Sequence, residues 1–143
     1  MKLYHGSPKD LKTLKPQLAV GETDFENQKA IFFTDSFVQA ALYAFGKSLK
    51  GKTAFALPPE KLIIVGNFEP AKIGYVYEVN INAEKGDNYQ FAYNKTITQF
   101  HKIRVYYEEF KDKITWDKTK QELVEICKKE KLKNCSSLDT RVL

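Results

Sequence analysis

Residues 30–46 read Ala30-Ile-Phe-Phe-Thr-Asp-Ser-Phe-Val-Gln-Ala-Ala-Leu-Tyr-Ala-Phe-Gly46, a short apolar run followed by an alanine-rich segment. The β-favouring residues 31–33 predict a strand. Residues 34–36 follow with three side-chain oxygens, which suit the cap of a helix N-terminus. Apolar residues then recur at helical spacing, so we expect a one-faced helix from about Phe37 to Gly46. Tyr43 falls at the edge of the apolar stripe, where its ring can pack half-buried or face a ligand.

The composition is that of one basic domain. The chain has 143 residues, of which 43% are hydrophobic and 13% aromatic. This is enough for one sizeable core and too little for two. The net charge of +5 gathers in residues 1–20, with four lysines and one aspartate, and in residues 111–133, with eight lysines and five acids. Such an excess favours phosphate-bearing partners, although a solvated lysine face is the simpler explanation of the second region taken alone.

Several classes of protein are not indicated by the sequence. No signal-peptide pattern and no apolar window of membrane-spanning length is present, so we expect a cytoplasmic protein without a membrane segment. Cys127 and Cys135 lie eight residues apart without a second pair or nearby histidines. We expect reduced thiols there and no metal site. The sequence also has no phosphate-loop motif.

The remaining pattern predicts an α+β fold in a single domain over residues 1–143. Further strands are expected at residues 2–5, 53–57, 62–65 and 75–81, with two more between 89 and 107, and residues 75–81 should have one core face. The polar residues 17–29 are expected to form an exposed lid. A capping box from Thr119 to Glu122 predicts a C-terminal helix over residues 114–134.

The opening segment is a candidate binding site. His5 ends the first predicted strand, and Gly6-Ser7 follow it. A histidine at the end of a strand can bond a ligand hydroxyl, while the Gly6 backbone, which has no Cβ to shield it, lies open to a planar amide. The alternative is a turn histidine without a task.

Three motifs, in this order, resemble the small bacterial and phage ADP-ribosyltransferase-like domains. They are Leu3-Tyr-His-Gly-Ser7, Ile31-Phe-Phe-Thr-Asp35 followed by Ala40-Ala-Leu-Tyr-Ala44, and Gly74-Tyr-Val-Tyr-Glu78. The family uses a poly(ADP-ribose)-polymerase-like triad of histidine, tyrosine and a third residue, usually glutamate. The resemblance covers residues 2–107. It implies a split antiparallel β-sheet core with flanking helices, and NAD as the substrate in a cleft between two small sheets.

The resemblance also implies which residues form the triad. His5 and Tyr43 match its histidine and tyrosine. At the third site the best match is Gln90, where the family carries glutamate. Glu108 and Glu109 are rivals, but they follow the last predicted strand instead of opening one.

NAD contacts follow from the same resemblance. His5 would bond the adenosine ribose, the Gly6 backbone would hold the nicotinamide carboxamide, and Tyr43 would stack on the cationic nicotinamide ring. Ser7 and Thr34 complete the implied NAD-binding residues. A carboxylate at the third site would stabilise the ribosyl cation, a charge that Gln90 lacks.

Three functions remain open from the sequence. The first is an ADP-ribosyltransferase of a toxin, phage or defence setting, acting on a protein or nucleic-acid acceptor. The second is a degenerate module of the same fold that binds NAD or a partner without turnover, which Gln90 favours. The third is a basic RNA-processing enzyme that uses His5 and His101 as acid and base. The third needs the two histidines close in space, whereas the first needs His5 near Tyr43 and Gln90.

Overall fold

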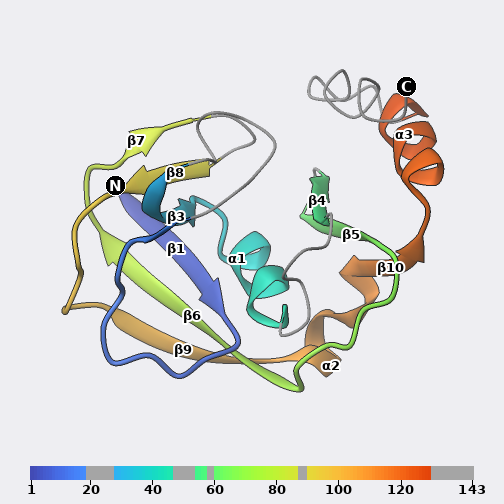
Figure 1. The fold of residues 1–143 in the computed structure, drawn as a ribbon. Helices are drawn as coiled ribbons and strands as arrows, with labels where there is room; N and C mark the ends of the chain where they lie inside the picture. The colour runs from blue at the N-terminus through green and yellow to red at the C-terminus, as the bar shows by residue number, and fades with distance from the viewer. Residues whose placement is uncertain (19–27, 47–53, 58–59, 87–89, 130–143) are drawn as a thin grey trace.

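The computed structural model describes residues 1–18, 28–46, 54–57, 60–86 and 90–129. Within these ranges the fold is α+β, with two β-sheets and one helix between them (Figure 1). The strands are β1 (Lys2–Ser7), β2 (Gln17–Leu18), β3 (Lys29–Thr34), β4 (Ala54–Leu57), β5 (Lys61–Val65), β6 (Ile73–Asn80), β7 (Glu84–Lys85), β8 (Gln90–Tyr93), β9 (His101–Tyr106) and β10 (Ile114–Lys118). The helices are α1 (Phe37–Ala44), α2 (Tyr107–Phe110), the short 3₁₀ turn η1 (Lys111–Lys113) and α3 (Lys120–Lys129).

The larger sheet is antiparallel throughout. Its strands follow the order β7-β8-β3-β1-β6-β9, and β2 pairs with β3 beside this path. Strand β1 pairs with β6 along its whole length, from Lys2 opposite Asn80 to Ser7 opposite Tyr75. Its pairing with β3 is limited to Tyr4 opposite Thr34. The two central strands β1 and β3 therefore share little of a normal ladder.

The C-terminal helix is shorter than predicted, because the first residues of the predicted helix belong to the smaller sheet. This sheet has the order β10-β5-β4, with β10 parallel to β5 and Ile114 opposite Leu62. The helix predicted over residues 114–134 is therefore wrong for residues 114–118, which form β10. Helix α3 starts at Lys120, directly after Thr119 of the predicted capping box. In this box the Glu122 amide donates to Thr119 Oγ1 at 3.0 Å and the Thr119 amide donates to Glu122 Oε1 at 3.1 Å. Residues 130–134 lie outside the described part of the chain.

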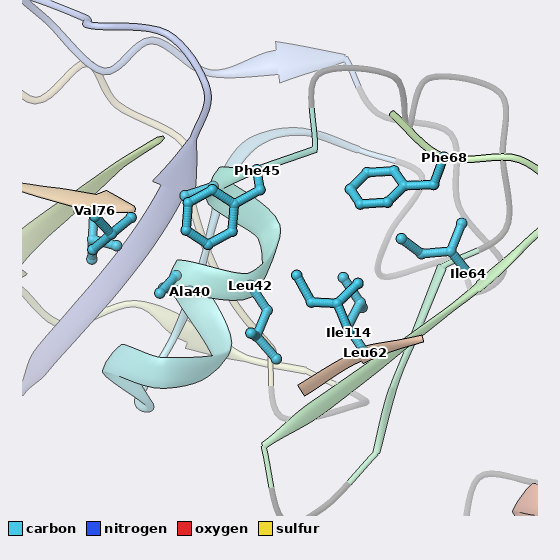
Figure 2. Close-up of a cluster of buried hydrophobic side chains, with 11 residues drawn as sticks. Ala40, Leu42, Phe45, Leu62, Ile64, Phe68, Val76 and Ile114 are labelled. Atoms are coloured by element: carbon cyan, nitrogen blue, oxygen red, sulfur yellow. The ribbon is translucent and has the colours of Figure 1, made fainter. Parts of the chain in front are cut away.

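Helix α1 forms where the sequence predicts it. Ser36 is the N-cap and its hydroxyl accepts from the Gln39 amide at 3.1 Å. The expectation of a one-faced helix is wrong, because α1 lies between the two sheets (Figure 1). Figure 2 shows Leu42 directed toward Leu62 and Ile114 of the smaller sheet, on the side of the helix away from Val76. Ala40 and Ala44 thus face the larger sheet at Gly6 and Gly74, while Leu42 faces the smaller sheet.

A second cluster covers the opposite face of the larger sheet. Its buried members are Leu3, Leu14, Ile31, Phe33, Tyr77, Val79, Phe91 and Ile97. Since Val76 belongs to the cluster around α1 and Tyr77 to this one, β6 is buried on both faces, and the single core face predicted for residues 75–81 is wrong. Both central faces of the larger sheet are therefore packed.

The segment after β1 is fixed over this second cluster. The Tyr77 hydroxyl donates to the Lys9 carbonyl at 2.7 Å and accepts from the Leu11 amide at 2.6 Å. Leu14 is buried and exchanges two backbone bonds with Ile97, both at 2.9 Å. Residues 8–16 thus form a loop that covers the second cluster. The Tyr77 hydroxyl and the backbone bridge between Leu14 and Ile97 hold this loop in place.

Other expectations are met only in part. Residues 17–18 of the predicted lid form β2, while residues 19–27 lie outside the described part of the chain, as do Cys135 and the side chain of Cys127. Across the described ranges, no helix is long and apolar enough to cross a membrane.

Candidate functional site

Gly6 is the point where strand β1 meets the helix that carries Tyr43. A Cβ built on Gly6 would overlap the Ala40 carbonyl oxygen and lie 3.0 Å from the Ala44 nitrogen. Tyr43 belongs to this same helical turn and is half-buried at the margin of the α1 cluster. The missing Cβ of Gly6 makes room for α1, a role that the sequence did not indicate. The close packing brings Tyr43 to β1.

His5 lies inside β1, which continues to Ser7, and not at the strand end that the sequence predicts. Its ring nitrogen Nδ1 lies 2.7 Å from the Phe32 carbonyl oxygen on β3. The ring also packs edge-on against Phe33, with centroids 5.9 Å apart. The imidazole therefore bridges β1 and β3 beyond Tyr4, where the ladder between these strands has ended.

The bond to Phe32 fixes the chemistry of the His5 ring. A carbonyl oxygen only accepts, so Nδ1 carries the proton and Nε2 is an acceptor while the ring is neutral. Burial lowers the pKa of His5 below its ordinary 6.5, and the bond to the Phe32 carbonyl opposes this shift without cancelling it. No described residue hydrogen-bonds Nε2. At neutral pH, His5 therefore offers one acceptor nitrogen suited to a ligand hydroxyl.

Gln90 is the first residue of strand β8. It stands directly opposite Thr34, which stands opposite Tyr4. Directly opposite residues share a face of a sheet. Since Tyr4 packs on Phe37 of α1, Gln90 and Thr34 lie on the face that carries this helix. At about 4.8 Å per strand, Gln90 is about 10 Å from Tyr4 along the sheet.

The predicted site residues lie on both faces of the β8-β3-β1 region. Gln90 and Thr34 share the helix face with Tyr43, and Gly6 touches the helix itself. His5 leaves β1 on the opposite face, since its neighbours Phe33 and Tyr77 belong to the second cluster. The sheet therefore separates the His5 ring from Gln90 and Thr34, while its Nδ1 bonds the backbone of β3.

The hydroxyls of Ser7 and Thr34 are used by the fold itself. Ser7 is buried and its Oγ accepts from the Lys9 amide at 3.1 Å. Thr34 Oγ1 accepts from the Ser36 amide at 3.2 Å, next to the cap of α1. Each hydroxyl keeps a hydrogen to donate, but the structure gives both a local role in turning the chain.

The rival acids lie elsewhere. Glu108 and Glu109 are exposed on α2, which follows β9 at the edge of the sheet opposite to β8. Glu108 forms an ion pair with Lys111 at 2.9 Å. Neither residue shares the row of Gln90 and Thr34.

The two histidines are not a pair. His5 is opposite Tyr77 and His101 is opposite Glu78, so they are two strands apart on opposite faces of the sheet. The RNA-processing hypothesis required them to be close, and the structure contradicts that requirement. His101 is exposed at the edge strand β9. The described residues also contain no group of three or more His, Cys, Asp and Glu side chains that could hold a metal ion.

The sequence did not reveal the Phe32 carbonyl as a functional group. This backbone atom sets the tautomer of His5. A backbone acceptor cannot be recognised from the residue type, and its position depends on the separation of β1 from β3.

No protein-family model, curated protein or solved structure matches the chain.

Proposed function

We propose that this protein is an NAD-dependent ADP-ribosyltransferase. The observation that carries the proposal is the state of His5, a neutral ring with an acceptor Nε2, beside a glycine packed on the turn that carries Tyr43. The resemblance of the sequence motifs names these same positions. Gln90 adds a third polar group two strands away on the helix face.

The binding roles follow from the chemistry of each group. His5 Nε2 would accept a hydrogen bond from a ribose hydroxyl, since Nδ1 is engaged by Phe32. The Gly6 backbone, on the side of β1 where pairing with β3 has ended, would bond the nicotinamide carboxamide. The Tyr43 ring would stack on the cationic nicotinamide, a contact that contributes about 0.5–2 kcal/mol when desolvated.

Gln90 sets the expected rate. In the transfer step the bond between ribose C1′ and nicotinamide breaks, and its electron pair leaves with the nicotinamide. The acceptor atom bonds C1′ and loses its proton. A glutamine oxygen can orient a ribose hydroxyl but adds no charge to stabilise the ribosyl cation and no basicity to take that proton. We therefore expect slow turnover by the natural sequence.

The test follows nicotinamide release from labelled NAD with separate protein, DNA and RNA pools. We expect Gln90→Glu to raise the rate by about tenfold to a thousandfold, and Gln90→Ala to lower NAD affinity and any transfer. Glu108→Gln and Glu109→Gln are the matched controls and should change little, because both lie outside the Gln90 row. If either control silences the enzyme while Gln90→Ala has no effect, the third site is assigned wrongly.

A second function is favoured by the same glutamine. A fold of this kind without a catalytic carboxylate is suited to hold NAD without cleaving it. If NAD binds and neither the natural protein nor Gln90→Glu releases nicotinamide, the protein is a binding module.

A further inference from the structure

Strands β6 and β9 carry an exposed aromatic and basic patch on the face of the larger sheet opposite to α1. Ile73 and Tyr106 are direct cross-strand partners and are 39% and 43% exposed. Tyr75 and Arg104 form the next cross-strand pair on this face, with Tyr75 half-buried and Arg104 exposed. We call these four residues the β6–β9 patch. Two of the large hydrophobic side chains that remain exposed are thus immediate neighbours.

The charge around the patch is positive. The Tyr106 side chain raises the pKa of Arg104, and Tyr75 adds to this shift, so the guanidinium interacts with both tyrosines. Lys102 follows on the same face, where it bonds Asp10, and the exposed Lys72 directly precedes β6. The chain as a whole carries +5. Only one of the four patch residues is aliphatic, so the surface offers ring faces and a planar cation more than apolar area.

We propose that the β6–β9 patch binds single-stranded nucleic acid. Unpaired bases stack on tyrosine rings and on the guanidinium plane, while nearby lysines meet the phosphates, and neither contact reads sequence. A sheet surface with rings on neighbouring strands suits an extended single strand. Duplex DNA keeps its bases stacked on each other and offers the patch only its phosphates.

The patch lies close to His5. The cross-strand row of Arg104 and Tyr75 continues to Ser7 on β1, and the adjacent row on this face holds Lys102, Tyr77 and His5. Two residues along a strand span about 7 Å. Tyr75 is thus one row and one strand from His5, roughly 8 Å within the sheet, and Arg104 is one strand further. That it is the acceptor of ADP-ribose rests on the proposed function, whereas the binding itself does not.

Binding is measured by fluorescence anisotropy with labelled oligothymidylate and oligouridylate of about 20 nucleotides, without NAD. We expect the natural protein to bind both, more weakly as salt rises from about 50 to 200 mM. Tyr106→Ala and Arg104→Ala should each weaken binding about 5- to 100-fold. Arg104→Ala should also flatten the plot of log affinity against log salt, by about 0.7 for each phosphate that the variant no longer neutralises.

Two control variants test whether the loss of affinity is specific to the β6–β9 patch. Trp116→Ala removes an exposed aromatic of the smaller sheet, and Lys29→Ala an exposed cation of β3. Melting temperatures confirm that all variants fold. The proposal is overturned if the natural protein binds neither oligonucleotide at low salt, or if the controls lose as much affinity as the patch variants. It is also overturned if sedimentation shows a natural dimer that Arg104→Ala dissociates, because the patch then serves a second copy.

A final experiment, with NAD present, distinguishes nucleic-acid binding by the patch from the proposed transferase activity. With NAD present, Arg104→Ala should lose ADP-ribosylation of the oligonucleotide while nicotinamide release to water stays unchanged. If the strand binds and no nicotinamide is ever released, the patch stands and the transferase does not. If nicotinamide is released but no strand binds, the transferase stands and the patch does not.

Discussion

At the scale of single residues, the sequence identifies His5 as a candidate site residue but does not predict its protonation state. Its position before Gly6 marks it as a candidate, but its protonation state depends on the Phe32 carbonyl, 27 residues away. Thr34 and Ser7 show the converse. The sequence motifs mark both as candidates, yet their hydroxyls accept bonds from nearby backbone amides. Local motifs identify residue types, while the partner that gives each its role comes from the fold.

The lowered pKa of His5 predicts a pH dependence of stability. The unfolded chain binds a proton near pH 6.5, and the folded protein does so only at lower pH. Stability is therefore full above about pH 6.5 and falls as the pH drops through the folded pKa. His5→Asn keeps an N–H donor for the Phe32 carbonyl and removes the titration. Denaturant unfolding from pH 7.5 to 5 should show a smaller loss for this variant. Equal pH slopes for both proteins would contradict the assignment of a neutral His5.

Tyr77 provides a second prediction at this scale. Burial raises the pKa of Tyr77, so its hydroxyl stays protonated and serves both Lys9 and Leu11. Tyr77→Phe leaves two backbone groups unpaired and should cost about 1–3 kcal/mol in the free energy of unfolding. Tyr93→Phe is the control, since Tyr93 is a half-buried member of the same cluster and makes no hydrogen bond with a described residue. An equal cost for both changes would mean that the hydroxyl does not hold the loop.

At the scale of elements, the residue pattern of a segment predicts its structure correctly where the stabilising contacts lie within that segment. The strand and cap before α1 and the capping box of α3 are both observed. The prediction is wrong where pairing or packing with a strand far away in the sequence determines the structure. Residues 114–118 become a strand because β5 pairs with them, and α1 is covered on two sides because a second sheet lies beyond it. Neither partner is visible in the segment itself.

The contact between Gly6 and α1 gives a prediction about this element. Gly6→Ala places a Cβ on the Ala40 carbonyl, so helix and strand must separate. We expect a loss of at least about 1–3 kcal/mol in unfolding free energy, measured by denaturant titration. Gly66→Asn is the control, because Gly66 has a positive φ of 87° that asparagine tolerates and no atom within 4 Å of a Cβ. A tolerated Gly6→Ala would show that α1 does not rest on β1.

At the scale of the whole molecule, the α+β class could be predicted from the strand and helix patterns, and the antiparallel character of the larger sheet was expected only from the resemblance. The order of the strands could not be predicted, because β8 joins β3 and β1 lies between β3 and β6 through pairings between segments far apart in the chain. That order places Gln90 beside Thr34 and separates His5 from His101. The strand order therefore determines which of the candidate residues lie on the same face of the sheet.

The most direct test of the account is the melting temperature of the natural protein with and without millimolar NAD. A ligand at about 100 times its dissociation constant adds about 2.7 kcal/mol, which corresponds to a rise of roughly 5–10 °C for a chain of this size. His5→Asn and Tyr43→Leu should abolish the rise, while Lys29→Ala should keep it. The account predicts this pattern. A folded natural protein whose melting temperature does not change in NAD would contradict it.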